Sequence, residues 1–190
     1  MCSTLKDTNL LSAQDAYAWL SSFDKYGWVF GLERMRLLLG QLGNPQDFLK
    51  VIHVAGTNGK GSVSSTIAAI LGNAGYRTGL FTSPHLVNIR ERIVFDGRWI
   101  SEADFCDAVS EISLYADIVY EKHGEYPTFF ELIYAVAMHY FYKSGVDIAV
   151  LEAGLGGRLD ATNVSCPVMT VITRIAYDHP KTLGRTMKKI

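Results

Sequence analysis

The sequence predicts an α/β protein built on a doubly wound, mainly parallel sheet. Three observations support this fold class. Short apolar runs of strand length alternate with longer segments of helical periodicity. The first such run leads straight into a glycine-rich turn that carries a lysine, which is typical of a phosphate-binding loop. A chain of 190 residues with 48% hydrophobic residues can bury a substantial core, so we expect one domain over residues 1–190.

The amino-terminal half is expected to hold two helices and then the first two strands. Helices are predicted over 12–22 and 32–42, with a glycine-containing loop between them. A strand, the phosphate loop and a helix occupy 51–73, and the helix itself covers 63–73. A second strand is predicted at 78–82.

The second half is expected to hold an extended segment, two long helices and two strands. Residues 87–95 form a hairpin or an extended loop, and Asp96-Gly97 is the turn signal that follows it. Ser101 can serve as the N-cap of the next helix, and Gly145 stops the one after it. The predicted helices cover 101–122 and 128–143, and the predicted strands cover 147–151 and 168–173.

The glycine-rich turn has the composition of a nucleotide-binding loop. Gly56, Gly59 and Gly61 permit backbone conformations closed to residues with a Cβ, so successive N–H groups can point into one concavity. Lys60 adds a positive charge, and Ser62 offers an oxygen to a phosphate-bound Mg²⁺. An ordinary turn would explain the glycines but not the lysine aimed at a helix N-terminus. The candidate nucleotide-binding residues are Gly56, Thr57, Asn58, Gly59, Lys60, Gly61 and Ser62.

The spacing of this loop, together with four later segments, points to one enzyme family. Only two residues separate Gly56 from the Gly59-Lys60 pair, where the common P-loop has four. The later segments are Arg77–Leu86, Glu91-Arg92-Ile93, Leu151–Asn163 and Asp178-His179. From about Ala16 to the last residue, the chain resembles folylpolyglutamate synthase and the bifunctional dihydrofolate synthase/folylpolyglutamate synthase, members of the Mur ligase superfamily.

This resemblance implies an ATP-dependent ligase that works with Mg²⁺. ATP phosphorylates the carboxylate of a folate, or of dihydropteroate in bifunctional members, and the amine of L-glutamate attacks the acyl phosphate. By resemblance, Lys60 contacts the β- and γ-phosphates, and the backbone from Thr57 to Ser62 forms their cradle. The metal ligands implied are Ser83, Glu152 and His179, and the catalytic residues are Lys60, Glu152 and His179.

Glu152 also stands out on physical grounds. It ends the apolar run 146–151, which reads as a central parallel strand, and ligands of open α/β sheets bind at the carboxyl ends of such strands. The alternative is an ordinary surface acid after a strand. Gly154, Gly156 and Gly157 could let the next loop approach a ligand closely, or could form a plain turn.

Substrate contacts are expected from two further segments that match the family. The residues are Thr128, Phe129 and Glu131 in one segment, and Asp160, Thr162 and Asn163 in the other. Phe130 and Tyr134 fit helix core better, because aromatic residues at helical spacing usually pack inside.

The histidines outside the motifs carry weaker signals. His53 lies inside the first strand and is expected to be a hydrogen-bonded core residue, whereas His85 is a candidate substrate contact. For His123 and His139 we expect solvent exposure or helix packing.

Composition suits a compact cytoplasmic enzyme. The formal net charge of −1 gives no electrostatic argument for nucleic acid or an acidic membrane surface. Cys2, Cys106 and Cys166 show no metal-type spacing and fit reduced thiols. The first nine residues lack the features of a signal peptide, and no stretch approaches the roughly 20 apolar residues that span a bilayer.

The final residues indicate a fragment. A helix is expected to begin at Thr182 and to continue to Ile190 without a stop signal. We expect the chain to be an incomplete Mur ligase central ATPase domain that lacks the carboxyl-terminal glutamate ligase domain and has no turnover by itself. The full-length family protein is expected to be monomeric, while the fragment can self-associate through apolar strands left without neighbours.

Two other function classes remain open at this point. One is a nucleotide-binding module without chemistry, and the other is a different P-loop enzyme such as a small-molecule kinase. The short glycine spacing, Ser83-Pro84-His85 and the 156–163 segment count against a kinase. Other Mur ligases are disfavoured because only about 50 residues precede the loop, too few for a typical domain.

Overall fold

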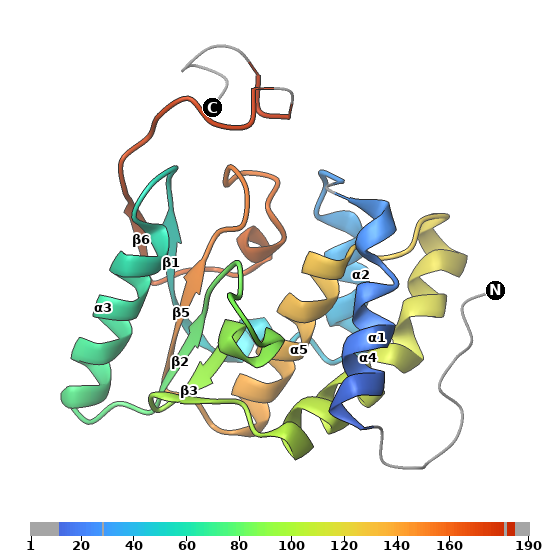
Figure 1. The fold of residues 1–190 in the computed structure, drawn as a ribbon, viewed down its shortest axis with the longest axis horizontal. Helices are drawn as coiled ribbons and strands as arrows, with labels where there is room; N and C mark the ends of the chain where they lie inside the picture. The colour runs from blue at the N-terminus through green and yellow to red at the C-terminus, as the bar shows by residue number, and fades with distance from the viewer. Residues whose placement is uncertain (1–11, 28, 181, 185–190) are drawn as a thin grey trace.

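A computed structural model of the chain describes residues 12–27, 29–180 and 182–184. Six strands form one sheet in the order β4-β3-β2-β5-β1-β6, with helices on both faces (Figure 1). Neighbours are parallel among β1 (Lys50–Ala55), β2 (Thr78–Phe81), β5 (Ile148–Glu152) and β6 (Met169–Ile172). β3 (Ile93–Phe95) and β4 (Arg98–Trp99) add an antiparallel hairpin at the β2 edge. The predicted doubly wound, mainly parallel sheet is confirmed.

The two central strands, β1 and β5, are apolar on both faces because each face is covered by helices. Val51 is opposite Ala149 in the register and joins the larger core, whereas Ile52 is opposite Val150 and joins a smaller cluster on the other face. Both strands end at one edge of the sheet, so the residues that follow them converge there.

Helix α3 (Lys60–Asn73) covers one face of the sheet, where Val63 and Ile67 pack against Ile52 and Val150. The predicted start of this helix at Val63 is wrong, because the helix already begins at Lys60. The bond from Val63 N–H to the Gly59 carbonyl, 3.0 Å long, closes its first turn. Lys60, Gly61 and Ser62 therefore belong to the helix N-terminus rather than to a preceding loop.

The opposite face is covered by α5 (Phe129–Lys143), which is buried along most of its length. Outside it lie α1 (Ala13–Ser21), α2 (Glu33–Gln41) and α4 (Glu102–His123), which pack on α5 and on one another (Figure 1). The predicted N-cap Ser101 accepts a hydrogen bond of 3.0 Å from Asp104 N–H. Tyr134 is fully buried, as predicted.

Short 3-10 helices and a tight turn complete the connections. The 3-10 helices are η1 (Asp24–Tyr26), η2 (Pro45–Phe48), η3 (Ile89–Arg92) and η4 (Ala161–Val164). Asp96 and Gly97 have φ values of 46° and 73°, as a two-residue hairpin turn requires, so the predicted turn between β3 and β4 is confirmed.

Several sequence predictions fall outside the described residues. These are the amino-terminal segment with Cys2 and most of the helix expected from Thr182 to Ile190. In the part of the chain that the structure describes, no helix has the length and apolar character needed to cross a membrane.

Candidate functional site

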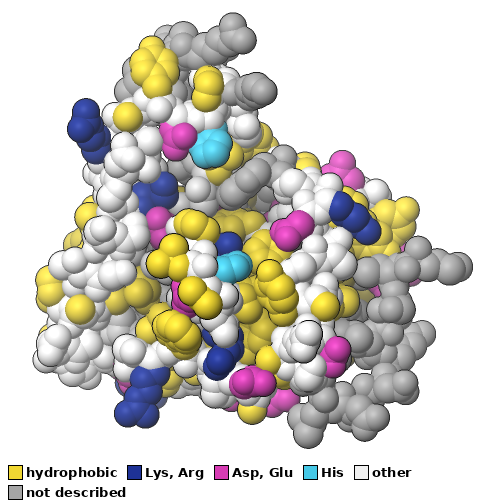
Figure 2. Space-filling model, in the orientation of Figure 1, with side chains coloured by type: hydrophobic (Ala, Val, Ile, Leu, Met, Phe, Trp, Pro, Cys, Tyr) yellow, Lys and Arg dark blue, Asp and Glu magenta, His cyan; other side chains and the backbone are white. Residues whose placement is uncertain are grey.

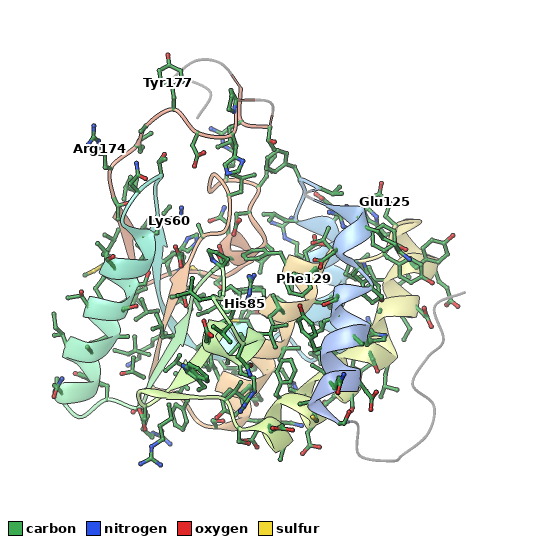
Figure 3. All side chains as sticks on the ribbon, in the orientation of Figure 1. Lys60, His85, Glu125, Phe129, Arg174 and Tyr177 are labelled. Carbon is green, nitrogen blue, oxygen red and sulfur yellow. The ribbon has the colours of Figure 1, made fainter. Side chains whose placement is uncertain are left out.

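A cavity of about 850 Å³ opens where β1, β2 and β5 end. Figure 3 shows Lys60 at the start of α3 on one side of this edge and Phe129 at the start of α5 on the other. Figure 2 shows hydrophobic side chains gathered in the middle of the same face of the molecule. Seven of the predicted site residues line the cavity directly: Gly56, Thr57, Lys60, Ser83, His85, Phe129 and His179.

The phosphate loop presents an open helix N-terminus to this cavity. The N-cap of α3 is Gly59, with a φ of 85°, so the N-cap residue has no side chain with which to cap the helix. The first turn of α3 contains no acidic residue. The partial positive charge of this 14-residue helix therefore favours an anion at the cavity, although one N–H of the first turn, that of Gly61, is directed at Glu152.

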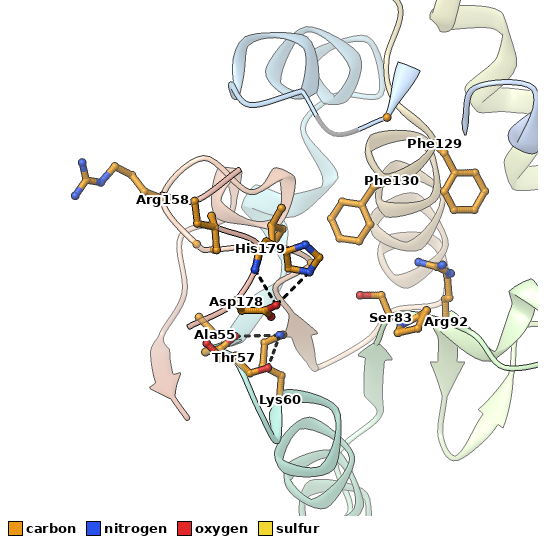
Figure 4. Close-up of a pocket in the computed structure, with 18 of the residues that line it drawn as sticks. Ala55, Thr57, Lys60, Ser83, Arg92, Phe129, Phe130, Arg158, Asp178 and His179 are labelled. Carbon is orange, nitrogen blue, oxygen red and sulfur yellow. Dashed lines mark hydrogen bonds and ion pairs between the residues drawn. The ribbon is translucent and has the colours of Figure 1, made fainter. Parts of the chain in front are cut away.

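Lys60 lies across the loop that precedes it. Its Nζ donates to the carbonyl of Gly56 at 3.0 Å and to that of Thr57 at 3.3 Å (Figure 4). These contacts hold a partly buried ammonium group at the mouth of the helix N-terminus, where it adds a full charge to the helix dipole.

The segment after β6 fixes the first part of the loop. The N–H groups of Thr57 and Asn58 donate to the carbonyl of Arg174 at 2.9 and 3.3 Å. The Thr57 hydroxyl exchanges hydrogen bonds of 3.1 Å with the backbone of Ala176. Two amides of the expected cradle are thus already used, so the part of the loop that can receive an anion is the start of α3.

Glu152 and Ser83 meet behind this loop. The Ser83 N–H donates to Glu152 Oε2 at 2.9 Å, and the Gly61 N–H also faces the carboxylate. Glu152 is only 4% exposed. Burial raises the pKa of Glu152, although the two N–H groups, Lys60 and Arg92 oppose that rise. The structure therefore brings together two of the three predicted metal ligands.

His179 reaches the cavity from the segment after β6, and Figure 4 shows it beside Asp178 and above Lys60. Its N–H donates to Asp178 Oδ1 at 2.9 Å, and its ring Nε2 lies 3.5 Å from the same oxygen. Among the described residues, no three His, Cys, Asp or Glu side chains are grouped for metal binding. A metal here would depend on substrate oxygens and water for most of its ligands, as Mg²⁺ usually does.

The wall opposite Lys60 joins two predicted substrate contacts, His85 and Phe129, to Arg92, a residue for which the sequence motifs predicted no role. Arg92 is buried, its Nε donates to His85 Nδ1 at 2.8 Å, and its guanidinium lies 5.3 Å from the centre of the Phe129 ring. Tyr17 and Asp24 complete this wall. Burial lowers the pKa of His85, and the charge of Arg92 lowers it further.

Thr128 and Glu131 are engaged in buried contacts at the start of α5. Thr128 is the N-cap, and its N–H donates to Glu131 Oε2 at 2.7 Å. Glu131 also accepts two hydrogen bonds of 3.2 Å from Arg34, a buried residue of α2. A third contact joins Arg34 to Glu125 at 2.7 Å. This ion-pair network ties α2 to the start of α5.

Asp160 and Thr162 are buried in a second network below the glycine loop. Asp160 accepts hydrogen bonds from the Leu155 N–H, 2.8 Å long, and from the Thr162 hydroxyl. His53 Nε2 lies 2.8 Å from the same hydroxyl, so the prediction that His53 is a satisfied core histidine is confirmed. Asn163 donates to the Arg158 carbonyl at 3.0 Å on the outer side of the loop.

The buried predicted residues still border the site region. Thr128, Glu131 and Asp160 surround a second cavity of about 20 Å³, room for about one water molecule. Phe130 and Leu155 line both cavities and so form the partition between them. A Cβ at Gly154 would lie 2.6 Å from the Phe130 ring, so a larger residue there would require this ring to shift.

Comparison with known proteins identifies relatives over nearly the whole chain. The dihydrofolate synthase/folylpolyglutamate synthase of Bacillus subtilis (strain 168) is 41% identical over 178 residues, covering 93% of this chain and 41% of the relative. A solved FPGS–AMPPCP complex matches with a TM-score of 0.87 and 38% identity, covering 94% of this chain and 43% of that one. E. coli FolC in complex with DHPP and ADP matches with a TM-score of 0.83 and 35% identity, covering 94% and 43%.

These relatives identify the protein family of the chain. No family model matches the chain. The relatives do not favour the kinase alternative, and the structural matches confirm the Mur ligase-like fold. The chain spans about two fifths of the length of these relatives. It belongs to the family of folylpolyglutamate and dihydrofolate synthases.

Proposed function

We propose that this chain is the nucleotide-binding part of an ATP-dependent ligase that adds L-glutamate to the carboxylate of a folate, and also to dihydropteroate. The observation that carries this proposal is that Lys60 opens on the cavity at the N-terminus of α3, with the buried carboxylate of Glu152 directly behind it. The solved relatives named for AMPPCP, ADP and DHPP support the same assignment.

The geometry suits a reaction between two anions. Lys60 and the first turn of α3 would hold the β- and γ-phosphates of ATP, while the acceptor carboxylate approaches from the Arg92 side. Excluding water and concentrating cations around both groups lowers their repulsion as the acyl phosphate forms. The glutamate amine then attacks the acyl phosphate and displaces inorganic phosphate.

The donors around Glu152 fit Mg²⁺. Glu152 is a buried carboxylate whose Oε2 accepts from the Ser83 N–H, and carboxylate and hydroxyl oxygens are ligands that this ion prefers; we propose Ser83, Glu152 and His179 as its ligands. When bound, Mg²⁺ would neutralise charge on the transferring phosphoryl group. His179 has a left-handed backbone conformation, with a φ of 44°, and its backbone N–H donates to Asp178. It belongs to the same segment after β6 that hydrogen-bonds the phosphate loop through the Arg174 carbonyl.

The substrate residues are proposed with different roles. Phe129 lines the cavity and would contact the acceptor directly. Thr128, Glu131 and Asp160 would act at the second cavity, where a pterin ring could enter only if the Phe130 partition moved. Thr162 would hold Asp160 in place there, and Asn163 would hold the loop through the Arg158 carbonyl.

The chain alone is proposed to bind nucleotide without steady turnover. Its 190 residues match about two fifths of the relatives' length, and the glutamate-binding part is proposed to lie in the remainder. Steady ATP-dependent addition of glutamate to a folate by the purified chain would contradict this proposal. We also propose a cytoplasmic location, because the described Cys106 and Cys166 are free thiols; cell fractionation would test it.

Calorimetric titration with Mg-ATP tests the core of the proposal. Lys60→Ala should weaken binding roughly 10- to 100-fold, the usual effect of losing a charged hydrogen bond to phosphate. Lys50→Ala is the matched control, because Lys50 is an exposed lysine at the other end of β1. Equal affinity in the unchanged chain and the Lys60→Ala variant would contradict the assigned phosphate site.

A further inference from the structure

Arg92 is a nearly buried cation that faces the cavity without an ion-pair contact among the described residues. Its side chain lines the cavity although the residue is only 8% exposed. Its one hydrogen bond within the described part of the chain joins Nε to His85 Nδ1. Asp24, which lines the same cavity, and Glu152 act on its charge from a distance, and neither described carboxylate forms an ion pair with it. A buried guanidinium normally has an anionic partner, because leaving such a charge unpaired is costly.

The surroundings of Arg92 fix the plane of the guanidinium. Arginine can only donate, so His85 accepts at Nδ1 and is neutral with its proton on Nε2. The Phe129 ring supports one face of the guanidinium, with 5.3 Å between Cζ and the ring centre. These contacts occupy Nε and one face, and they leave the two terminal nitrogens as a fork that matches a carboxylate.

The position of Arg92 relative to Lys60 indicates which anion it receives. Lys60 and Arg92 both oppose the burial-driven rise in the pKa of Glu152, so both charges lie near that buried carboxylate. Figure 4 shows Arg92 next to Ser83 and under Phe129, across the cavity from Lys60. A carboxylate on Arg92 would thus face a phosphate held at Lys60.

We propose that Arg92 binds the carboxylate of the acceptor substrate through its two terminal nitrogens, and that His85 is the positioning residue that orients it. This inference rests on the proposed ligase function, since it names the residue that would present the acceptor to ATP. The ligand class is an aromatic carboxylate such as pteroate, or the glutamate conjugate of such a carboxylate.

The test compares two ligands that differ only in charge, pteroate and its carboxamide, by calorimetry on the 190-residue chain. Arg92→Gln should weaken pteroate binding roughly 10- to 100-fold and leave carboxamide binding unchanged. The affinity of Arg92→Lys for pteroate should lie between those of the unchanged chain and Arg92→Gln, because lysine keeps the charge but loses the two-nitrogen fork. Arg98→Gln, which removes an exposed arginine on β4 that does not line this cavity, should leave both ligands unaffected.

Each other outcome overturns the proposal in a different way. Equal losses for pteroate and its carboxamide would mean that Arg92 is only structural. A loss of Mg-ATP affinity with unchanged pteroate binding would assign Arg92 to the nucleotide phosphates. If the unchanged chain binds neither pteroate nor Mg-ATP, the proposed function fails and this inference fails with it. If Mg-ATP binding depends on Lys60 but pteroate affinity is the same with and without Arg92, only the inference fails.

His85 is tested by rescue. His85→Asn can keep an acceptor close to the position of Nδ1, whereas His85→Leu removes it. We expect His85→Leu to weaken pteroate but not carboxamide binding, and His85→Asn to restore most of the loss. Equal affinities in the two variants would contradict the positioning role.

Discussion

Gly56 is the position where the structure makes its sharpest prediction about the phosphate loop. The residue has a φ of 135°, and a Cβ there would collide with the Thr173 hydroxyl and lie 3.2 Å from the Thr173 carbonyl carbon. Gly59, in the same loop, has a φ of 85° but open space around its Cβ position. An alanine at Gly59 therefore meets backbone strain alone, whereas an alanine at Gly56 meets both strain and steric overlap.

The expected magnitudes differ clearly between the two glycines. Gly59→Ala carries about 1–2 kcal/mol of left-handed strain, offset by about 0.4–1 kcal/mol from the stiffer unfolded chain. Gly56→Ala adds overpacking of roughly 1–3 kcal/mol to strain of about the same size, so we expect a loss of about 3 kcal/mol or more. In a chain of this size that lowers Tm by roughly 6–12 °C.

Urea and thermal unfolding, with Mg-ATP binding in parallel, provide the assay. Thr173→Ala removes the colliding hydroxyl, so in the double variant it should recover roughly 1–2 kcal/mol of the Gly56→Ala loss and leave the backbone strain. The reasoning is refuted if Gly56→Ala is no less stable than Gly59→Ala, or if Thr173→Ala gives no recovery.

Three further predictions concern the rest of the molecule. Glu131→Gln should cost roughly 3–5 kcal/mol of unfolding free energy because it leaves Arg34 buried without its main partner, whereas Asp147→Asn, at an exposed pair, should change the urea midpoint little. Burial lowers the pKa of His53 in the folded chain, so as the pH falls through the unfolded value of about 6.5 the unfolded chain takes up a proton on this imidazole more readily than the folded chain does. The Tm should therefore fall between pH 7 and pH 5, and it should fall less in the His53→Gln variant. Ile172 on β6 is 66% exposed, so the chain should self-associate at high concentration and Ile172→Lys should reduce this in light scattering; a monodisperse unchanged chain would contradict the prediction.

The sheet was largely predictable because its strands are short and apolar on both faces. Val51–Val54 and Ala149–Leu151 can be read as buried strands without knowing their neighbours. The start of α3 could not be read in this way. Its N-cap is Gly59 in a left-handed conformation rather than a Ser, Thr, Asp or Asn, and Gly61 and Ser62 are weak helix formers.

The Arg92 wall was not predictable from local pattern. Tyr17 comes from α1, Asp24 from η1, Arg92 from η3 and Phe129 from α5, so only the tertiary fold brings them to one cavity. Arg92 was visible only as part of a family segment, since an arginine before an apolar strand ordinarily indicates a solvated strand end. Its burial is a property of the fold rather than of its neighbours in sequence.

The predicted substrate residues show how a family motif can locate a site without giving each side chain its role. Glu131 uses both carboxylate oxygens on Arg34 and caps its own helix, and Asp160 uses both oxygens on Thr162 and Leu155. A carboxylate can accept further hydrogen bonds, so these engagements do not prevent ligand contact, but they do fix where each oxygen lies. Both residues are therefore held rigidly around the small cavity behind Phe130, and any acceptor ring that reaches them must displace that ring while the carboxylates stay in place.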